Sequence, residues 1–119
     1  MTTQQIADRL ASLCKEANWG QAHKELYAQD CVSIEPYASQ GFEKEVKGID
    51  AITKKGKDFD GMIEAAHGVS VSDPLVTGNT IAFVLDMDMT MKGQPRGNMS
   101  ELCVYTVKDG KIVAEQFFM

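Results

Sequence analysis

The strongest local signal in this sequence is a β-hairpin near the C-terminus, Glu101-Leu-Cys-Val-Tyr-Thr-Val-Lys-Asp-Gly-Lys-Ile-Val-Ala-Glu-Gln-Phe-Phe118. Two runs rich in β-branched and aromatic residues flank Asp109-Gly110, a dipeptide that readily adopts the left-handed backbone of a two-residue hairpin turn. Because side chains alternate between the two faces of a strand, Glu101, Cys103 and Tyr105 are predicted to share one face.

The pairing across this hairpin decides whether Glu115 joins Glu101 on that face. A sheet tolerates buried acids only when they are paired, hydrogen-bonded or neutral, so two carboxylates on an apolar face favour chemistry or ligand binding. The alternative is a solvent-exposed face, or a pair held by a lysine or by Arg96. Tyr105 can pack there with its hydroxyl bonded to a carboxylate. Acidic neighbours predict that Cys103 is an inert thiol.

Length and composition predict one domain spanning residues 1–119 with its own core, because 44% of 119 residues are hydrophobic. A net charge of −5 argues against nucleic acid or an anionic membrane as a partner. The chain shows neither a signal peptide nor a membrane-length apolar run. Three cysteines without metal-type spacing predict free thiols in a reducing compartment, so we expect a cytoplasmic protein.

Lysines gather between positions 43 and 58, where they alternate with acidic residues. This interleaving is typical of a solvated face and not of a phosphate groove. The lysines concerned are Lys44, Lys47, Lys54, Lys55 and Lys57.

The first half of the chain has helical spacing. One apolar stripe comprises Ile6, Leu10, Leu13, Cys14 and Ala17. Thr2 and Gln5 could form a capping box before that stripe. A second short helix carries Trp19, Ala22, His23 and Leu26, and a third carries Ile49, Ile52, Gly56, Phe59 and Met62 or Ile63. Between them, Cys31–Glu35 reads as a strand ended by Pro36, with an irregular segment at 37–48.

The second half reads as strands only. The predicted strands are Ile63–Ser72, Thr80–Lys92, Met99–Val107 and Lys111–Phe118. Helices followed by an antiparallel meander predict an α+β fold, in which three N-terminal helices cover one face of a curved, mainly antiparallel sheet. Such a conical barrel has an open end, which is a natural pocket for a small molecule.

The longest predicted strand places its apolar side chains on one face. These are Phe83, Leu85, Met87, Met89 and Met91. They form either plain core or a soft cavity wall, because methionine suits irregular apolar ligands. As a cavity wall, the candidate ligand-binding residues are Phe83, Leu85, Met87, Met89, Cys103 and Phe117.

Three stretches carry a resemblance to a known family. They are Glu25-Leu-Tyr-Ala-Gln-Asp-Cys-Val-Ser-Ile-Glu-Pro36, Gly48-Ile-Asp-Ala-Ile52 and Val104-Tyr-Thr-Val-Lys-Asp-Gly-Lys-Ile-Val113. With the order of elements, they make the chain similar to the SnoaL-like and ketosteroid-isomerase-like group of the nuclear transport factor 2 superfamily. The resemblance implies a conical α+β barrel, usually dimeric, with a ligand cavity. The family includes isomerases, cyclases, dehydratases and binding proteins, so it implies no single function.

Individual positions in the resemblance carry different implications. Glu35-Pro36 matches the proton-shuttling carboxylate of the isomerases, which precedes a proline at the end of the first strand. Their two oxyanion-binding positions correspond to Ala11 and Cys103, neither of which donates a strong hydrogen bond. Losing one such donor typically lowers the rate by about 10²–10³. The His and Asp on the last strand of SnoaL-type cyclases correspond to Glu115 and Phe117.

Two readings of function follow. In the first, an enzyme without metal or cofactor acts on a small, largely apolar carbonyl compound. A carboxylate (Glu35, Glu101 or Glu115) then moves the proton, and Tyr105 or His67 donates to the developing oxyanion. In the second, the same cavity stores or senses a hydrophobic ligand. His67, on the face of Val69 and Val71, can also be a satisfied core residue.

A homodimer is also expected. The outer face of the sheet carries Leu102, Val104 and Thr106, which is apolar for a surface in water, while the helices can cover only the other side. A third possibility for the function is a dimeric protein whose cavity is filled by its own side chains.

Overall fold

The computed structural model describes residues 1–39 and 41–119. Within that part of the chain the helices are α1 (Thr3–Lys15), α2 (Trp19–Leu26) and α3 (Ile49–Gly61). The strands are β1 (Tyr27–Ile34), β2 (Glu45–Lys47), β3 (Ile63–Val71), β4 (Leu75–Thr77), β5 (Thr80–Met91), β6 (Gly97–Lys108) and β7 (Lys111–Phe118).

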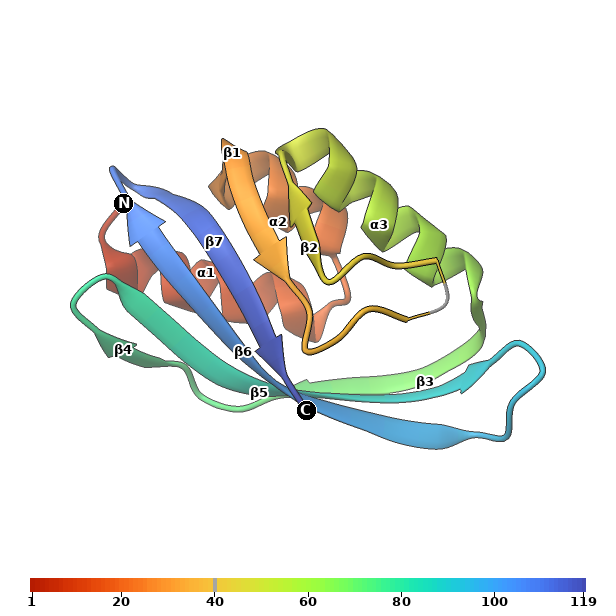
Figure 1. Cartoon of the computed structure of the whole chain (residues 1–119). Helices are drawn as coiled ribbons and strands as arrows, with labels where there is room; N and C mark the ends of the chain where they lie inside the picture. The colour runs from red at the N-terminus through yellow and green to blue at the C-terminus, as the bar shows by residue number, and fades with distance from the viewer. Residues whose placement is uncertain (40) are drawn as a thin grey trace.

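One curved sheet contains all of these strands. Their order is β2-β1-β7-β6-β5-β3, with β4 paired to β5. Every pairing is antiparallel except that of β1 with β7. The three helices lie together on one side of the sheet (Figure 1). The predicted α+β class and the placement of the helices are therefore confirmed.

The predicted capping box opens α1. The Gln5 backbone N–H donates to Thr2 Oγ1 at 3.1 Å, and the Thr2 backbone N–H donates to Gln5 Oε1 at 2.8 Å. Two otherwise unpaired donors are thereby satisfied. The helix then buries the stripe that includes Ile6, Leu10 and Leu13.

The C-terminal hairpin turns at Asp109 and Gly110, whose φ angles of 52° and 76° are both left-handed. Its register pairs Tyr105 with Glu115 and Cys103 with Phe117. Directly opposite residues of an antiparallel pair lie on the same face. The expectation that Glu115 shares a face with Tyr105 is therefore confirmed, although it depends on a shift in the pairing between Thr106 and Val107 that the turn alone does not predict.

Several boundaries differ from the predicted ones. The strand β1 begins at Tyr27, four positions before the predicted Cys31, because the chain passes from α2 directly into extended backbone. Within the segment 37–48, predicted to be irregular, β2 pairs with β1, while Gln40 lies outside the described residues. Both β2 and β4 are only three residues long, too short for side-chain alternation to reveal them. Ala17, expected on the first helix, lies beyond its end with a φ of 55°.

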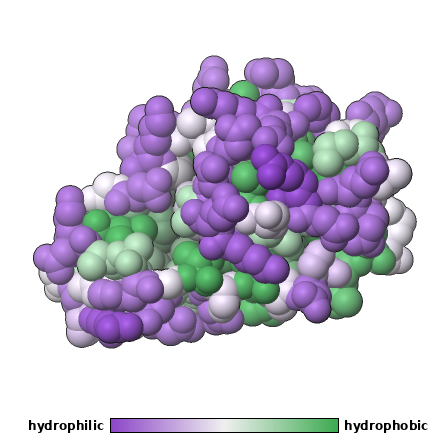
Figure 2. Space-filling view, turned by 180° about the vertical axis from the view of Figure 1, so that it is seen from behind, coloured by the Kyte–Doolittle hydropathy of each residue, from purple (hydrophilic) through white to green (hydrophobic). Residues whose placement is uncertain are grey.

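Seen from behind, the molecule is mostly hydrophilic, and hydrophobic residues occupy separate small areas (Figure 2). On the sheet, Val84, Leu102 and Phe118 are 37%, 41% and 46% exposed.

The three cysteines are buried free thiols, as predicted. None of the helices in residues 1–39 and 41–119 has the length and apolar character needed to cross a membrane.

Candidate functional site

A cavity of about 300 Å³ lies between the helices and the sheet. Most of its wall is apolar, and the apolar side chains come from both layers. The helices contribute Leu10, Cys14, Trp19, Ala22, Ile52 and Phe59. The sheet contributes Leu85, Met87, Met99 and Phe117, and the segment after β1 contributes Pro36, Tyr37 and Phe42. The volume is at the lower end of the range for small-molecule sites.

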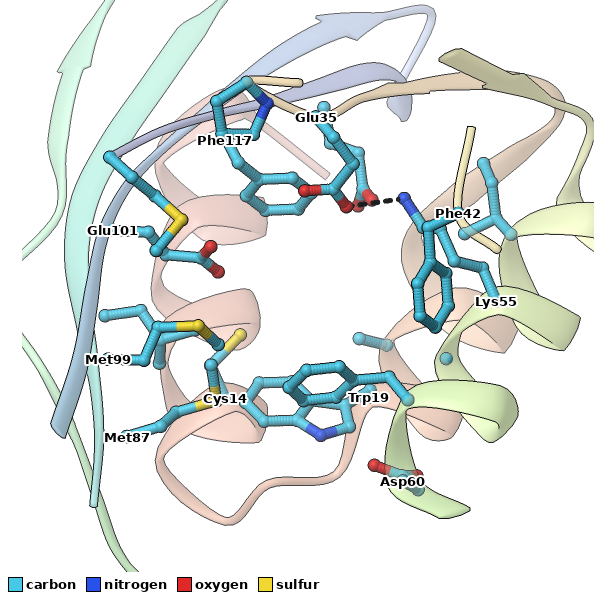
Figure 3. Close-up of a pocket in the computed structure, with 18 of the residues that line it drawn as sticks. Cys14, Trp19, Glu35, Phe42, Lys55, Asp60, Met87, Met99, Glu101 and Phe117 are labelled. Carbon is cyan, nitrogen blue, oxygen red and sulfur yellow. Dashed lines mark hydrogen bonds and ion pairs between the residues drawn. The ribbon is translucent and has the colours of Figure 1, made fainter. Parts of the chain in front are cut away.

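Three glutamates reach this cavity from the sheet, and a fourth acid, Asp60, borders it from α3. Glu35 directly follows β1, Glu101 lies on β6, and Glu115 lies on β7. In Figure 3 the carboxyl groups of Glu35 and Glu101 face the same central space, and Lys55 approaches Glu35 from α3. The site is thus a mostly apolar chamber with acids on its sheet side.

Glu115 is the most deeply buried of the three, with only 4% of its surface exposed. It accepts hydrogen bonds from the Tyr27 hydroxyl and, at 2.6 Å, from Ser33 Oγ. Burial raises the pKa of Glu115, and these two hydrogen bonds together with the charge of Lys55 act in the opposite direction.

Lys55 binds two groups at once. Its Nζ donates to Ser33 Oγ at 2.6 Å and to Glu35 Oε1 at 2.9 Å. Only 14% of its side chain is exposed. These contacts join Tyr27, Glu115, Ser33, Lys55 and Glu35 into one hydrogen-bonded chain.

The solvated face predicted for residues 43–58 is therefore wrong at Lys55. Helical spacing places Lys55 three residues after Ile52 and four before Phe59, both of which line the cavity. The preceding lysine, Lys54, does face solvent. Its side chain is 77% exposed and pairs with Asp58 one turn later.

Glu101 lies in a mostly buried environment with two other acids nearby. Burial, followed by the negative charges of Glu35 and Glu115, raises its pKa to about 7. Among the described residues its hydrogen-bond partner is the Cys103 thiol, 3.9 Å from Oε1. Protonated and ionised forms of Glu101 therefore coexist near neutral pH, which suits a group that gives or takes a proton.

His23 also lines the cavity, although it has no companion in the sequence that marks it as part of a site. Its ring packs edge-on against Tyr27 with the centroids 4.8 Å apart. Burial, and secondarily Lys55, lowers the pKa of His23 and favours the neutral ring. Its Nδ1 is buried without a hydrogen-bond partner in the described part of the chain.

Of the candidate catalytic residues, Glu35, Glu101, Glu115 and Tyr105 border the cavity. His67 does not: it is exposed on β3, and its Nε2 lies 2.9 Å from Thr90 Oγ1. The pairing of β3 with β5 shifts between Ala66 and Gly68. This irregularity interrupts the alternation that was expected to place His67 on the face of Val69.

The candidate ligand-binding residues divide into two groups. Leu85, Met87 and Phe117 line the cavity. Phe83, Met89 and Cys103 are buried in the core without being part of the cavity wall. Burial and the nearby Glu101 raise the pKa of the Cys103 thiol, which favours the unreactive protonated form.

Sequence reasoning missed Tyr27, Ser33 and Lys55. Ser33 could have been predicted, since alternation from Glu35 back along β1 places it on the same face. Lys55 could have been predicted from its helical spacing relative to Ile52 and Phe59. Tyr27 carried no such signal, because it precedes the strand that the sequence predicts.

Comparisons with known proteins find one family and several solved structures. The model of the SnoaL-like domain family matches residues 1–119. A Mesorhizobium loti protein, provisionally assigned as a SnoaL-like polyketide cyclase, is 33% identical over 100% of both chains, with a TM-score of 0.90. No curated protein matches the sequence significantly.

Two more distant structures contain small molecules. A Catenulispora acidiphila DSM 44928 protein with a ketosteroid-isomerase-like fold, in complex with trimethylamine, is 18% identical over 99% of this chain and 87% of its own, with a TM-score of 0.76. TerC, co-crystallised with polyporic acid, is 11% identical over 99% of this chain and 92% of its own, with a TM-score of 0.79.

Proposed function

This chain belongs to the SnoaL-like domain family, and on that premise we propose that it is a cofactor-independent enzyme of the isomerase or cyclase type. The substrate is a small, largely apolar carbonyl compound held in the cavity between helices and sheet. The proposal is supported above all by two carboxylates, Glu35 and Glu101, that face one apolar chamber in contrasting environments.

The contrast between these carboxylates supports an assignment of roles. Glu35 is ion-paired with Lys55, and its charged form is the proton acceptor. Glu101, whose pKa burial raises to about 7, supplies the acid. Pairs of acids in contrasting surroundings, here one ion-paired and one mostly buried, are typical of acid–base sites.

The proposed reaction conserves all atoms of the substrate. The Glu35 carboxylate removes a proton from a carbon next to the substrate carbonyl, while protonated Glu101 donates a hydrogen bond to the carbonyl oxygen. Return of the proton to a different carbon gives an isomer. Alternatively, attack of the enolate carbon on a second carbonyl closes a ring, and the alkoxide formed takes the proton back from Glu35. The apolar wall around Met87 and Phe117 holds the rest of the substrate.

A second candidate function is ligand binding without turnover. It is favoured because Ala11 and Cys103, at the two positions that the resemblance assigns to oxyanion binding, cannot donate a strong hydrogen bond. Ala11 is 3% exposed in the core, and Cys103 is fully buried. The relatives bound to trimethylamine and polyporic acid support a small-molecule cavity under either function, and they differ too much in charge to indicate one ligand.

Replacing Glu35 by glutamine separates the two functions. Glutamine keeps the size of the side chain but cannot take the proton, so kcat on a panel of apolar ketones, diketones and lactones should fall by about 10²–10⁴. Ligand affinity should change little. The matched control is Glu43→Gln, at an exposed position in the segment after β1, which should leave turnover intact.

Turnover that survives Glu35→Gln would remove Glu35 from the mechanism. If the wild-type protein binds members of the panel but converts none of them, and Glu35→Gln leaves their binding unchanged, the non-catalytic function is the correct one.

A further inference from the structure

Lys55 has a hydrogen-bonding capacity that its protein contacts do not fill. An ammonium group carries three donors, and two of them are directed to Ser33 Oγ and Glu35 Oε1. No third hydrogen-bond partner occurs among the described residues. The same Nζ lies 5.7 Å from the centre of the Phe117 ring, another part of the cavity wall.

The chain of hydrogen bonds behind Lys55 fixes the position of the ammonium. Ser33 is fully buried, and its single hydroxyl proton is donated to Glu115 Oε2. Its lone pairs are therefore left to accept from Lys55. Moving the ammonium away would leave this buried hydroxyl without one of its partners, which is unfavourable.

The geometry points to Lys55 as a ligand-binding residue whose free N–H donates to an oxygen atom of the bound molecule. A fixed ammonium favours an oxygen that carries or develops negative charge. The favoured ligands are therefore compounds with an acidic hydroxyl on an apolar body, namely phenols and the enols of β-dicarbonyl compounds. Ser33, Glu115 and Tyr27 act as positioning residues for the ammonium.

This inference rests on the proposed function for its choice of cavity and narrows the substrate class. Within the proposed reaction, a bound enolate would receive one hydrogen bond from Glu101 and one from Lys55. The positive charge of Lys55 also offsets part of the negative field of the surrounding carboxylates, which would otherwise disfavour an anionic ligand.

The test uses para-nitrophenol, whose ionised form absorbs visible light, so that the ionisation of the bound phenol can be titrated directly. An opposite charge in close contact typically lowers the pKa of an acid by about 1–3. Lys55→Met should therefore reduce the ionisation constant of the bound phenol about tenfold or more relative to wild type. The control Lys54→Met, at the exposed neighbouring lysine, should leave it unchanged.

Two further variants test the positioning role and guard against misfolding. Lys55→Arg keeps the positive charge and should retain most of the effect of the wild-type lysine. Ser33→Ala removes the acceptor behind Lys55 and should raise the pKa of the bound phenol, but less than Lys55→Met does. If Lys55→Met fails to fold, NMR of the wild-type protein with labelled lysine Nζ atoms replaces it. The Lys55 resonance is the one that is missing from the spectrum of Lys55→Arg, and para-nitrophenol should shift it in wild type.

The outcomes distinguish this inference from the proposed enzyme activity. Equal phenol ionisation in wild type and Lys55→Met, an unshifted Lys55 resonance, or no binding of para-nitrophenol to wild type would overturn the inference, even if turnover depends on Glu35. A Lys55-dependent ionisation in a protein without turnover would support the ligand class and refute the enzyme activity.

Discussion

Replacing Glu101 by glutamine is expected to make the protein more stable at alkaline pH and to leave its stability in acid nearly unchanged. Burial and two neighbouring carboxylates raise the pKa of Glu101 from an ordinary 4.5 to about 7. The folded state therefore binds this proton more tightly than the unfolded chain does. The stabilisation from the protonated form is complete below pH 4.5 and is lost as the pH rises through about 7.

The size of the effect follows from the same shift in pKa. One pKa unit corresponds to about 1.4 kcal/mol. Ionisation of Glu101 in the folded protein thus lowers the free energy of unfolding by about 3 kcal/mol relative to a variant that cannot ionise. Glutamine has nearly the shape of the protonated acid and carries no charge at any pH, so Glu101→Gln should not show this loss.

Urea denaturation at about pH 4.5 and about pH 9 measures the difference. Glu115, whose pKa burial also raises, contributes to the pH dependence of both proteins, and its interaction with Glu101 adds to the difference between them. Glu64→Gln, at an exposed position on β3, is the control and should behave as wild type. Parallel pH profiles for wild type and Glu101→Gln would refute the conclusion that Glu101 is held near neutrality in the cavity.

Two further predictions concern the cavity wall and the outer face of the sheet. Met87→Lys should abolish uptake of apolar ligands in calorimetry, because it places a charge in the apolar wall, whereas Leu75→Lys, 75% exposed on β4, should not. The wild-type protein should sediment as a homodimer through the face that includes Leu102, Val84 and Phe118, and Leu102→Glu should yield monomers. A monomeric wild type at micromolar concentration would contradict the dimer.

The sheet was predictable from the sequence because its signals are local. The Asp109-Gly110 turn sets the pairing next to it, and alternation places Glu101 and Tyr105 on one face of β6. Glu115 joins them only because the pairing of β6 with β7 shifts between Thr106 and Val107, and nothing in the sequence signals that shift. The short strands β2 and β4 were not predictable in this way, since they are defined by their pairing with β1 and β5.

The predictions for His67 and Lys55 were wrong because a local sequence pattern does not show strand-pairing irregularities or tertiary contacts. His67 obeys the alternation rule in sequence, but the shift in pairing between Ala66 and Gly68 removes it from the inner face. Lys55 lies in a run of lysines that resembles a solvated face. Its long apolar stem instead lets the ammonium reach Ser33 and Glu35 from the apolar side of α3.

The position of Lys55 relative to the three glutamates of the cavity explains why Glu101 is the acid in the proposed mechanism. Lys55 contacts Glu35 directly and Glu115 through Ser33, so neither carboxylate is far from a compensating charge. Glu101 has no such partner among the described residues. Burial and the charges of the other two acids favour its neutral form. The resemblance assigns the protonated donor of the isomerases to Cys103. Glu101 lies two residues earlier on the same face of β6, and it can supply from there the strong hydrogen bond that a thiol cannot.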